Sequence, residues 1–132
     1  MLNRFRGVSF LSDIHLSEKG SEVLLLIDNQ PARAYISTLS FFFTISISDS
    51  VILSNISIRY LTLLLAAHPG VHDYALQLSA AEAWLGCYYD KTLANEALAT
   101  ELEKQLALAR YLTNVVAGLG ITRQDVRHEV EL

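Results

Sequence analysis

The sequence predicts an α+β fold, in which an antiparallel sheet packs on helices and a long helix follows the last strand. The helix is expected over residues 92–119, where apolar side chains recur at steps of three and four without a proline. The sheet is expected because earlier segments alternate apolar and polar side chains, most clearly over residues 41–48. A long amphipathic helix needs a broad apolar surface to pack on, and the strands supply it.

Composition indicates one folded domain with an excess of apolar surface. A chain of 132 residues is expected to form a single domain over residues 1–132 with a sizeable core. Hydrophobic residues make up 52% and charged residues 18%, which predicts that two copies bury apolar surface between them as a homodimer. The net charge of -4 and the scattered basic residues argue against a nucleic acid or a membrane as partner.

Cysteine content and the placement of charges predict a cytoplasmic protein. Cys87 is the single cysteine and cannot form an internal disulfide, which fits a reducing compartment. Charged residues interrupt the apolar region 23–67, so no stretch reaches the ~20 apolar residues of a spanning helix. A signal peptide is not expected, because the apolar run after Arg4 and Arg6 is soon broken by polar side chains.

The first half of the chain predicts a short helix and three strands. Residues 1–6 suit a short helix with Leu2 and Phe5 on its buried side. Residues 8–16 fit a strand and a helix face equally well, and the choice stays open. Residues 23–27 and 32–38 then form a hairpin, because Pro31 tolerates the start of a strand, and residues 41–48 form the third strand.

The second half predicts a helix, two strands and the long helix. Residues 58–67 form a short helix that is apolar almost all round, so it is either deeply buried or shared with a second chain. Its Tyr60, Leu63 and Leu64 are expected in the dimer interface. Alternation over residues 73–79 and 83–89 gives two more strands. Thr92 is expected to cap the long helix, and Gly118 and Gly120 to end it.

The pattern with most resemblance to an enzyme is Asp13 and His15, two residues apart after an apolar run. Such a pair resembles the opening motif of metallophosphoesterases, where a carboxylate and an imidazole bind two metal ions. A centre of that kind needs further ligands, and His68, His72 and His128 lack the neighbours that would supply them. We therefore interpret the pair as chance alternation and expect no enzyme activity, metal or cofactor.

The expected order α-βββ-α-ββ-α resembles the class I chaperones of type III secretion, the Tir-chaperone family, over nearly the whole chain. The matching features are the opening residues 2–5, the strand that ends at Asp28, the helix over residues 58–67, the strand at Tyr74 and the final helix followed by Gly120. The resemblance implies a cytoplasmic homodimer that binds the extended N-terminal segment of a secreted effector and keeps it competent for secretion. It implies no nucleotide.

The resemblance directs the partner-binding prediction to the N-terminal region and the first strands. We expect apolar surface for an effector at Leu2, Phe5, Val23, Leu25, Tyr35 and Phe42. Phe42 is the strongest candidate, because it lies on the otherwise polar face of its strand beside Thr44 and Ser46. The alternative is a structural or regulatory dimeric α+β module without a secretion client.

Overall fold

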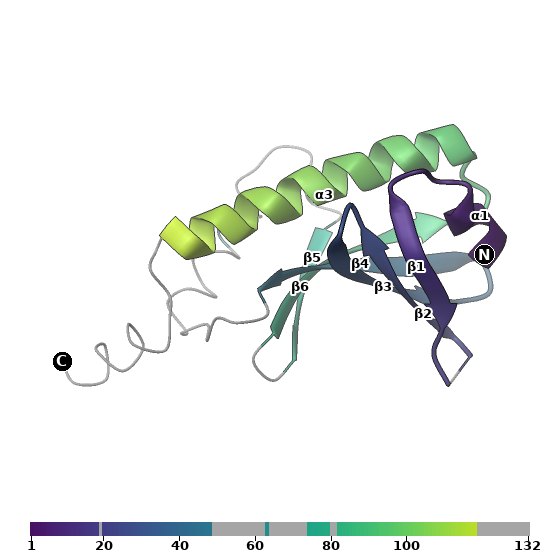
Figure 1. Cartoon of the computed structure of the whole chain (residues 1–132), viewed down its shortest axis with the longest axis horizontal. Coiled ribbons are helices and arrows are strands. Elements are labelled where there is room, and N and C mark those ends of the chain that lie inside the picture. Colours follow the sequence, from purple (N-terminus) through teal and green to yellow (C-terminus); the bar gives the residue numbers. More distant parts are fainter. Residues whose placement is uncertain (19, 49–62, 64–73, 80–81, 119–132) are drawn as a thin grey trace.

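The computed structural model describes residues 1–18, 20–48, 63, 74–79 and 82–118 (Figure 1). Its elements in chain order are α1 (Leu2–Arg6), β1 (Leu11–Leu16), β2 (Glu22–Ile27), β3 (Gln30–Ile36), β4 (Ser40–Ser48), β5 (Tyr74–Ser79), β6 (Glu82–Asp90) and α3 (Asn95–Gly118).

The strands form one sheet in the order β1-β2-β3-β4-β6-β5, and each neighbouring pair is antiparallel. The turn between β2 and β3 consists of Asp28 and Asn29, whose φ angles of 47° and 68° are those of a tight hairpin with the strand twist. In Figure 1, α3 lies across the sheet and α1 lies beside β1. The predicted α+β class with an antiparallel sheet and a long C-terminal helix is confirmed.

The segment over residues 8–16, for which the sequence left two alternatives, contains strand β1. Its register against β2 shifts between Ser12 and His15, and Asp13 has a φ of 51°. A bulge of this kind moves later side chains to the other face, so the segment follows no single period. The described chain therefore has four strands before residue 49, where three were expected.

Two other expectations concern helices. The predicted helix over residues 58–67 lies outside the described residues, apart from Leu63, which is helical and 67% exposed. The prediction that Thr92 caps the long helix is wrong, because α3 begins at Asn95. The Asp90 carboxylate instead accepts hydrogen bonds from the Thr92 N–H and hydroxyl, both at 2.8 Å, in the turn before the helix.

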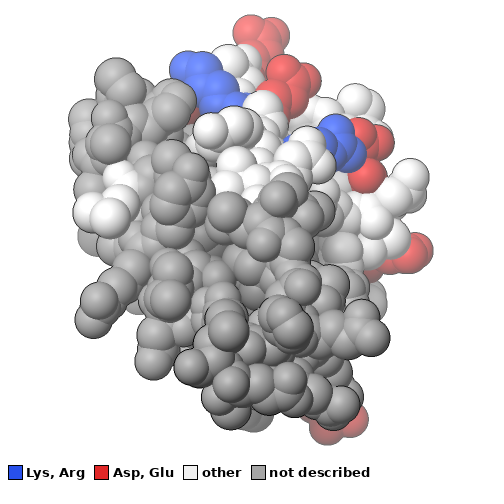
Figure 2. Space-filling view, turned by 90° about the vertical axis from the view of Figure 1, so that its left-hand side faces the viewer, with Lys and Arg blue, Asp and Glu red and all other residues white. Residues whose placement is uncertain are grey.

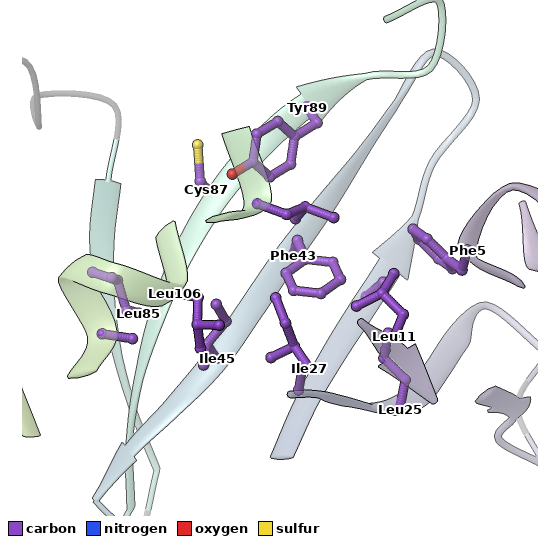
Figure 3. Close-up of a cluster of buried hydrophobic side chains, with 14 of the residues drawn as sticks. Phe5, Leu11, Leu25, Ile27, Phe43, Ile45, Leu85, Cys87, Tyr89 and Leu106 are labelled. Carbon is purple, nitrogen blue, oxygen red and sulfur yellow. The ribbon is translucent and has the colours of Figure 1, made fainter. Parts of the chain in front are cut away.

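The core lies on the face of the sheet that the helices cover (Figure 3). Phe5 of α1 packs edge-on against Phe41 and Phe43 of β4, with ring centroids 5.5 and 6.1 Å apart. Leucines at helical spacing along α3 complete this core. Its largest side chains are each less than 2% exposed, and they include Phe5, Phe41, Phe43, Ile45, Leu85, Leu98, Leu102 and Leu112.

A fully buried amide, that of Gln105, connects α3 to strands β4 and β6. Its Nε2 donates to the main-chain carbonyls of Phe43 on β4 at 2.8 Å and Leu85 on β6 at 2.9 Å. Its Oε1 accepts a hydrogen bond from the Tyr89 hydroxyl at 2.6 Å. An unpaired buried amide would cost about 1–3 kcal/mol, so these partners fix where the helix sits on the sheet.

The hydrogen bond to Gln105 requires that the Tyr89 hydroxyl keep its proton. Burial raises the pKa of the Tyr89 phenol, and the neighbouring Cys87 acts in the same direction. The phenol therefore stays protonated and donates to Gln105.

This raised pKa predicts a specific loss of stability at alkaline pH. The unfolded chain loses the tyrosine proton near the ordinary pKa of about 10, before the folded chain does. The stability that the raised pKa of Tyr89 contributes is therefore fully present below about pH 10. Above that pH, the free energy of unfolding falls by up to about 1.4 kcal/mol per pH unit. Urea denaturation of the wild type and Tyr89→Phe measures this contribution. Below pH 9 the gap in stability between the two should be constant, and it should shrink above pH 10; a gap that widens there contradicts the prediction.

Candidate partner-binding surfaces

One end of the covered face carries a pocket of about 440 Å³, which we call the N-terminal pocket. It lies between α1, the turn after β1, the end of β3 and the loop after β6. The residues that line it are Met1, Leu2, Asn3, Arg6, Leu16, Gly20, Val23, Ile36 and Lys91.

The apolar side of this pocket follows from strand register. Leu16 pairs directly with Val23, so both side chains share one face of the sheet, and Ile36 lies on the same face two residues beyond the partner of Val23. Val23 is buried, whereas Leu16 is 49% exposed. The pocket therefore has a fixed apolar floor and an apolar wall that remains open to solvent.

The polar side of the pocket depends on Arg4. Its guanidinium donates to Asn95 Oδ1 at 3.0 Å and to the main-chain carbonyls of Lys91 and Leu93. These bonds connect α1 to the loop after β6, although the residues are about ninety positions apart. They bring Lys91 to the rim of the pocket beside α1, which contributes Arg6.

The opposite face of the sheet carries the outer aromatic cluster, Tyr35, Phe42 and Tyr88. The Phe42 ring centroid lies 4.5 Å from that of Tyr88 and 6.4 Å from that of Tyr35. The ring also covers Gly86, where an added Cβ would lie 2.1 Å from Phe42 Cζ. Tyr88 is 69% exposed, so the cluster is partly open. The contact of the Phe42 ring with Gly86, which pairs with Thr44, explains why an aromatic residue occupies this otherwise polar face.

A second pocket, of about 280 Å³, lies farther along the outer face. The Arg33 guanidinium lies 4.6 Å from the centroid of the Trp84 ring and forms an ion pair with Glu22 at 3.8 Å. Trp84 Nε1 donates to Glu82 at 3.2 Å. The residues that line this pocket are Asp13, His15, Leu24, Leu25, Leu26, Pro31, Ala32, Arg33 and Trp84.

The structure divides the predicted partner-binding residues between these places. Leu2 and Val23 line the N-terminal pocket, and Tyr35 and Phe42 belong to the outer aromatic cluster. Phe5, at 0% exposure, and Leu25, at 4%, are core residues, as is Val23 at 1%. The expectation that these last three leave open apolar surface is wrong, because each points to the face that the helices cover. A binding role for Leu2, Tyr35 and Phe42 stays a prediction.

Sequence reasoning missed Arg6, Leu16, Ile36 and Lys91 in the N-terminal pocket. Leu16 follows the bulge in β1, so a strict alternation from the start of the strand assigns its side chain to the wrong face of the sheet. Lys91 reaches α1 only through hydrogen bonds between Arg4 and main-chain carbonyls, which no residue pattern encodes. The half-exposed Leu16 beside a buried Val23 becomes visible only once the register of β1 and β2 is known.

Asp13 and His15 lie at the bulge of β1, and both are exposed. His15 Nδ1 lies 2.9 Å from the main-chain oxygen of Asp13, so this ring nitrogen hydrogen-bonds its own strand. Within the described residues, no three His, Cys, Asp or Glu side chains gather in a group able to hold a metal ion. His68, His72 and His128 lie outside them.

The predicted dimer residues Tyr60 and Leu64 lie outside the described residues, so the interface prediction remains open. Leu63 is exposed. Cys87 is buried, and its thiol lies 3.6 Å from the Tyr88 carbonyl. In the part of the chain that the structure describes, neither α1 nor α3 is both long enough and apolar enough to cross a membrane.

The fold and the two pockets define a small α+β protein built on one antiparallel sheet. No family model matches the sequence. It is 40% identical over 116 residues, 88% of the chain, to Salmonella pathogenicity island 2 protein C of two strains of Salmonella typhimurium, with 87% of those proteins covered. The same identity and span relate it to the SpiC homolog of Salmonella typhi, of which 91% is covered. The chain therefore belongs to the family of Salmonella pathogenicity island 2 protein C.

The contact between Phe42 and Gly86 gives a test of the outer aromatic cluster. Gly86→Ala should lower the free energy of unfolding by about 1–3 kcal/mol, because the added Cβ displaces the Phe42 ring. In a Phe42→Ala background the same change should cost less, because the obstructing ring is gone. Chemical denaturation of both single variants and the double variant measures the coupling. Strictly additive costs would show that the ring does not rest on Gly86.

Proposed function

We propose that this chain is a chaperone of type III secretion, which binds the N-terminal segment of an effector and keeps it competent for secretion. The observation that carries the proposal is its 40% identity, over 88% of its length, to proteins named for a Salmonella pathogenicity island. The resemblance of its α+β order to the class I secretion chaperones supports a binding role within that setting.

The exposed surfaces suit an extended client. A chain in extended form presents alternate side chains to one surface and leaves its main chain free to pair with a sheet edge. The N-terminal pocket offers space for apolar side chains, and the outer aromatic cluster offers rings that are partly open. Among the described strands, β5 has a neighbour on one side only and carries no charged residue that would discourage pairing.

Binding, rather than catalysis, is the proposed activity, with the cytoplasm as its compartment and no cofactor. The client is held by contact area and main-chain hydrogen bonds, so no reacting group is required. The second candidate is a regulatory or structural dimer without a client. The apolar composition, 52% hydrophobic, favours association of two copies and is compatible with both candidates.

The client prediction is tested in the native host. A tagged full-length chain should co-purify with one or a few proteins, identified by mass spectrometry, that also appear in the secreted fraction. Deletion of its gene should remove the same proteins from the secreted fraction, and a plasmid copy should restore them. A regulatory module predicts a changed secretion profile without a direct complex between purified components. If no secreted protein binds and the profile is unchanged, the proposal fails.

The homodimer is tested by light scattering on the purified chain. We expect the wild type to have the mass of two chains and Leu64→Asp to have the mass of one, because a buried charge at an apolar interface is costly. Leu39→Asp is the matched control, since Leu39 is 78% exposed in the turn between β3 and β4 and should leave the mass unchanged. A wild type that is monomeric at all concentrations rules out the proposed dimer.

A further inference from the structure

The cationic side chains of the described residues divide into two groups. Most are engaged within the chain: Arg33 with Glu22, Lys104 with Glu101, Arg110 with Asp28, and Arg4 with two carbonyls and an amide. On the face shown in Figure 2, too, described Lys and Arg side chains lie beside Asp and Glu. Arg6 and Lys91 form the second group, because neither has an ion-pair partner within the described residues.

Both of these unpaired cations line the N-terminal pocket. The lining contains no Asp or Glu among its described residues, although the protein as a whole has a net charge of -4. The remaining walls are apolar, with Leu16 half-exposed and Val23 buried at the floor. Apolar walls with positive charges at the rim select a ligand that is apolar in its middle and anionic at its flanks.

The pocket is also held in shape before a ligand arrives. Arg4 fixes the loop that carries Lys91 against α1, and the Gly20 N–H donates to the Ser17 carbonyl at 3.0 Å in the turn beside Leu16. Gly20 has a φ of 77°, which this turn requires and which other residues rarely adopt. A preformed site loses less entropy on binding, so modest contacts can give measurable affinity.

We propose that the N-terminal pocket binds a segment of the partner protein in which a large apolar side chain is flanked by glutamate or aspartate. The inference rests on the proposed function, since it names the chemistry of the client at one site. The volume of about 440 Å³ suits a few side chains, and the two cations supply the charge complementarity. A nucleic acid is disfavoured, because an acidic protein with two free cations has little attraction for a polyanion.

The test uses purified full-length chain and labelled peptides that differ only in charge. The probes are a short peptide of alternating leucine and glutamate, and counterparts with glutamine or lysine in place of glutamate. Fluorescence anisotropy at low ionic strength should show that the glutamate peptide binds roughly 5- to 10-fold more tightly than the glutamine peptide, and that the lysine peptide binds weakest. High salt should remove most of the difference.

Variants locate the effect in the pocket. In the double variant Arg6→Gln and Lys91→Gln, the glutamate and glutamine peptides should bind within about 2-fold of each other. Lys104→Gln, which removes a cation that is already paired on α3, should keep the wild-type preference. Leu16→Ser should weaken both peptides roughly 5-fold, and Leu39→Ser, at an exposed turn, should not. Circular dichroism confirms that each variant is folded.

Three results would overturn the inference. Equal binding of the three peptides removes the charge preference, and a preference that survives in the double variant places it outside the pocket. Binding to vesicles of phosphatidylglycerol without binding to any peptide identifies a lipid surface as the ligand. The proposed function is judged separately, because a native client that binds the wild type and the double variant equally well leaves the chaperone standing and removes only this site.

Discussion

The position of α3 on the sheet depends on the buried amide of Gln105. Leucines on one side of a helix would pack almost as well after a small rotation or shift, because apolar contacts have little direction. The amide has partners only where Phe43 and Leu85 present their carbonyls and Tyr89 its hydroxyl. The helix is thereby fixed over the adjacent strands β4 and β6. Strands β1 and β5, at the two edges, keep one side without a strand neighbour among the described residues.

A second polar side chain, Arg4, fixes the position of α1, as Gln105 fixes the position of α3. The five-residue helix α1 is too short to be stable alone, so its place depends on tertiary contacts. Phe5 provides the apolar contact with Phe41 and Phe43, and Arg4 provides the directional one with the loop after β6. That loop leads directly into α3, so α1 and the start of α3 meet there. The N-terminal pocket forms only where these segments come together, so no single segment of the sequence indicates it.

The sequence was informative where one element follows one period. The long helix and β4 were predicted because their side chains repeat at helical and strand spacing without interruption. The bulge at Asp13 defeated the same reasoning in β1, since it changes the face within six residues. Phe5, Val23 and Leu25 were assigned to open surface because the sequence shows that a residue is apolar and not which side of the sheet the helices cover. Arg6 and Lys91 lie in one pocket because Arg4 hydrogen-bonds to main-chain carbonyls of the loop after β6. Every residue has such a carbonyl, so the sequence does not show which ones Arg4 contacts.

The two partly open surfaces impose different requirements on anything that binds them. The N-terminal pocket and the outer aromatic cluster lie on opposite faces of the sheet, because Val23 and Ala34 point to the covered face while Phe42 points away from it. One compact ligand therefore cannot contact both. An extended chain can contact both surfaces if it passes around the β1 edge of the sheet. Along that edge, the bulge leaves only Leu11, Ser12, His15 and Leu16 in regular register with β2. The proposed client, an extended segment without its own tertiary structure, meets this geometric condition for reaching both surfaces.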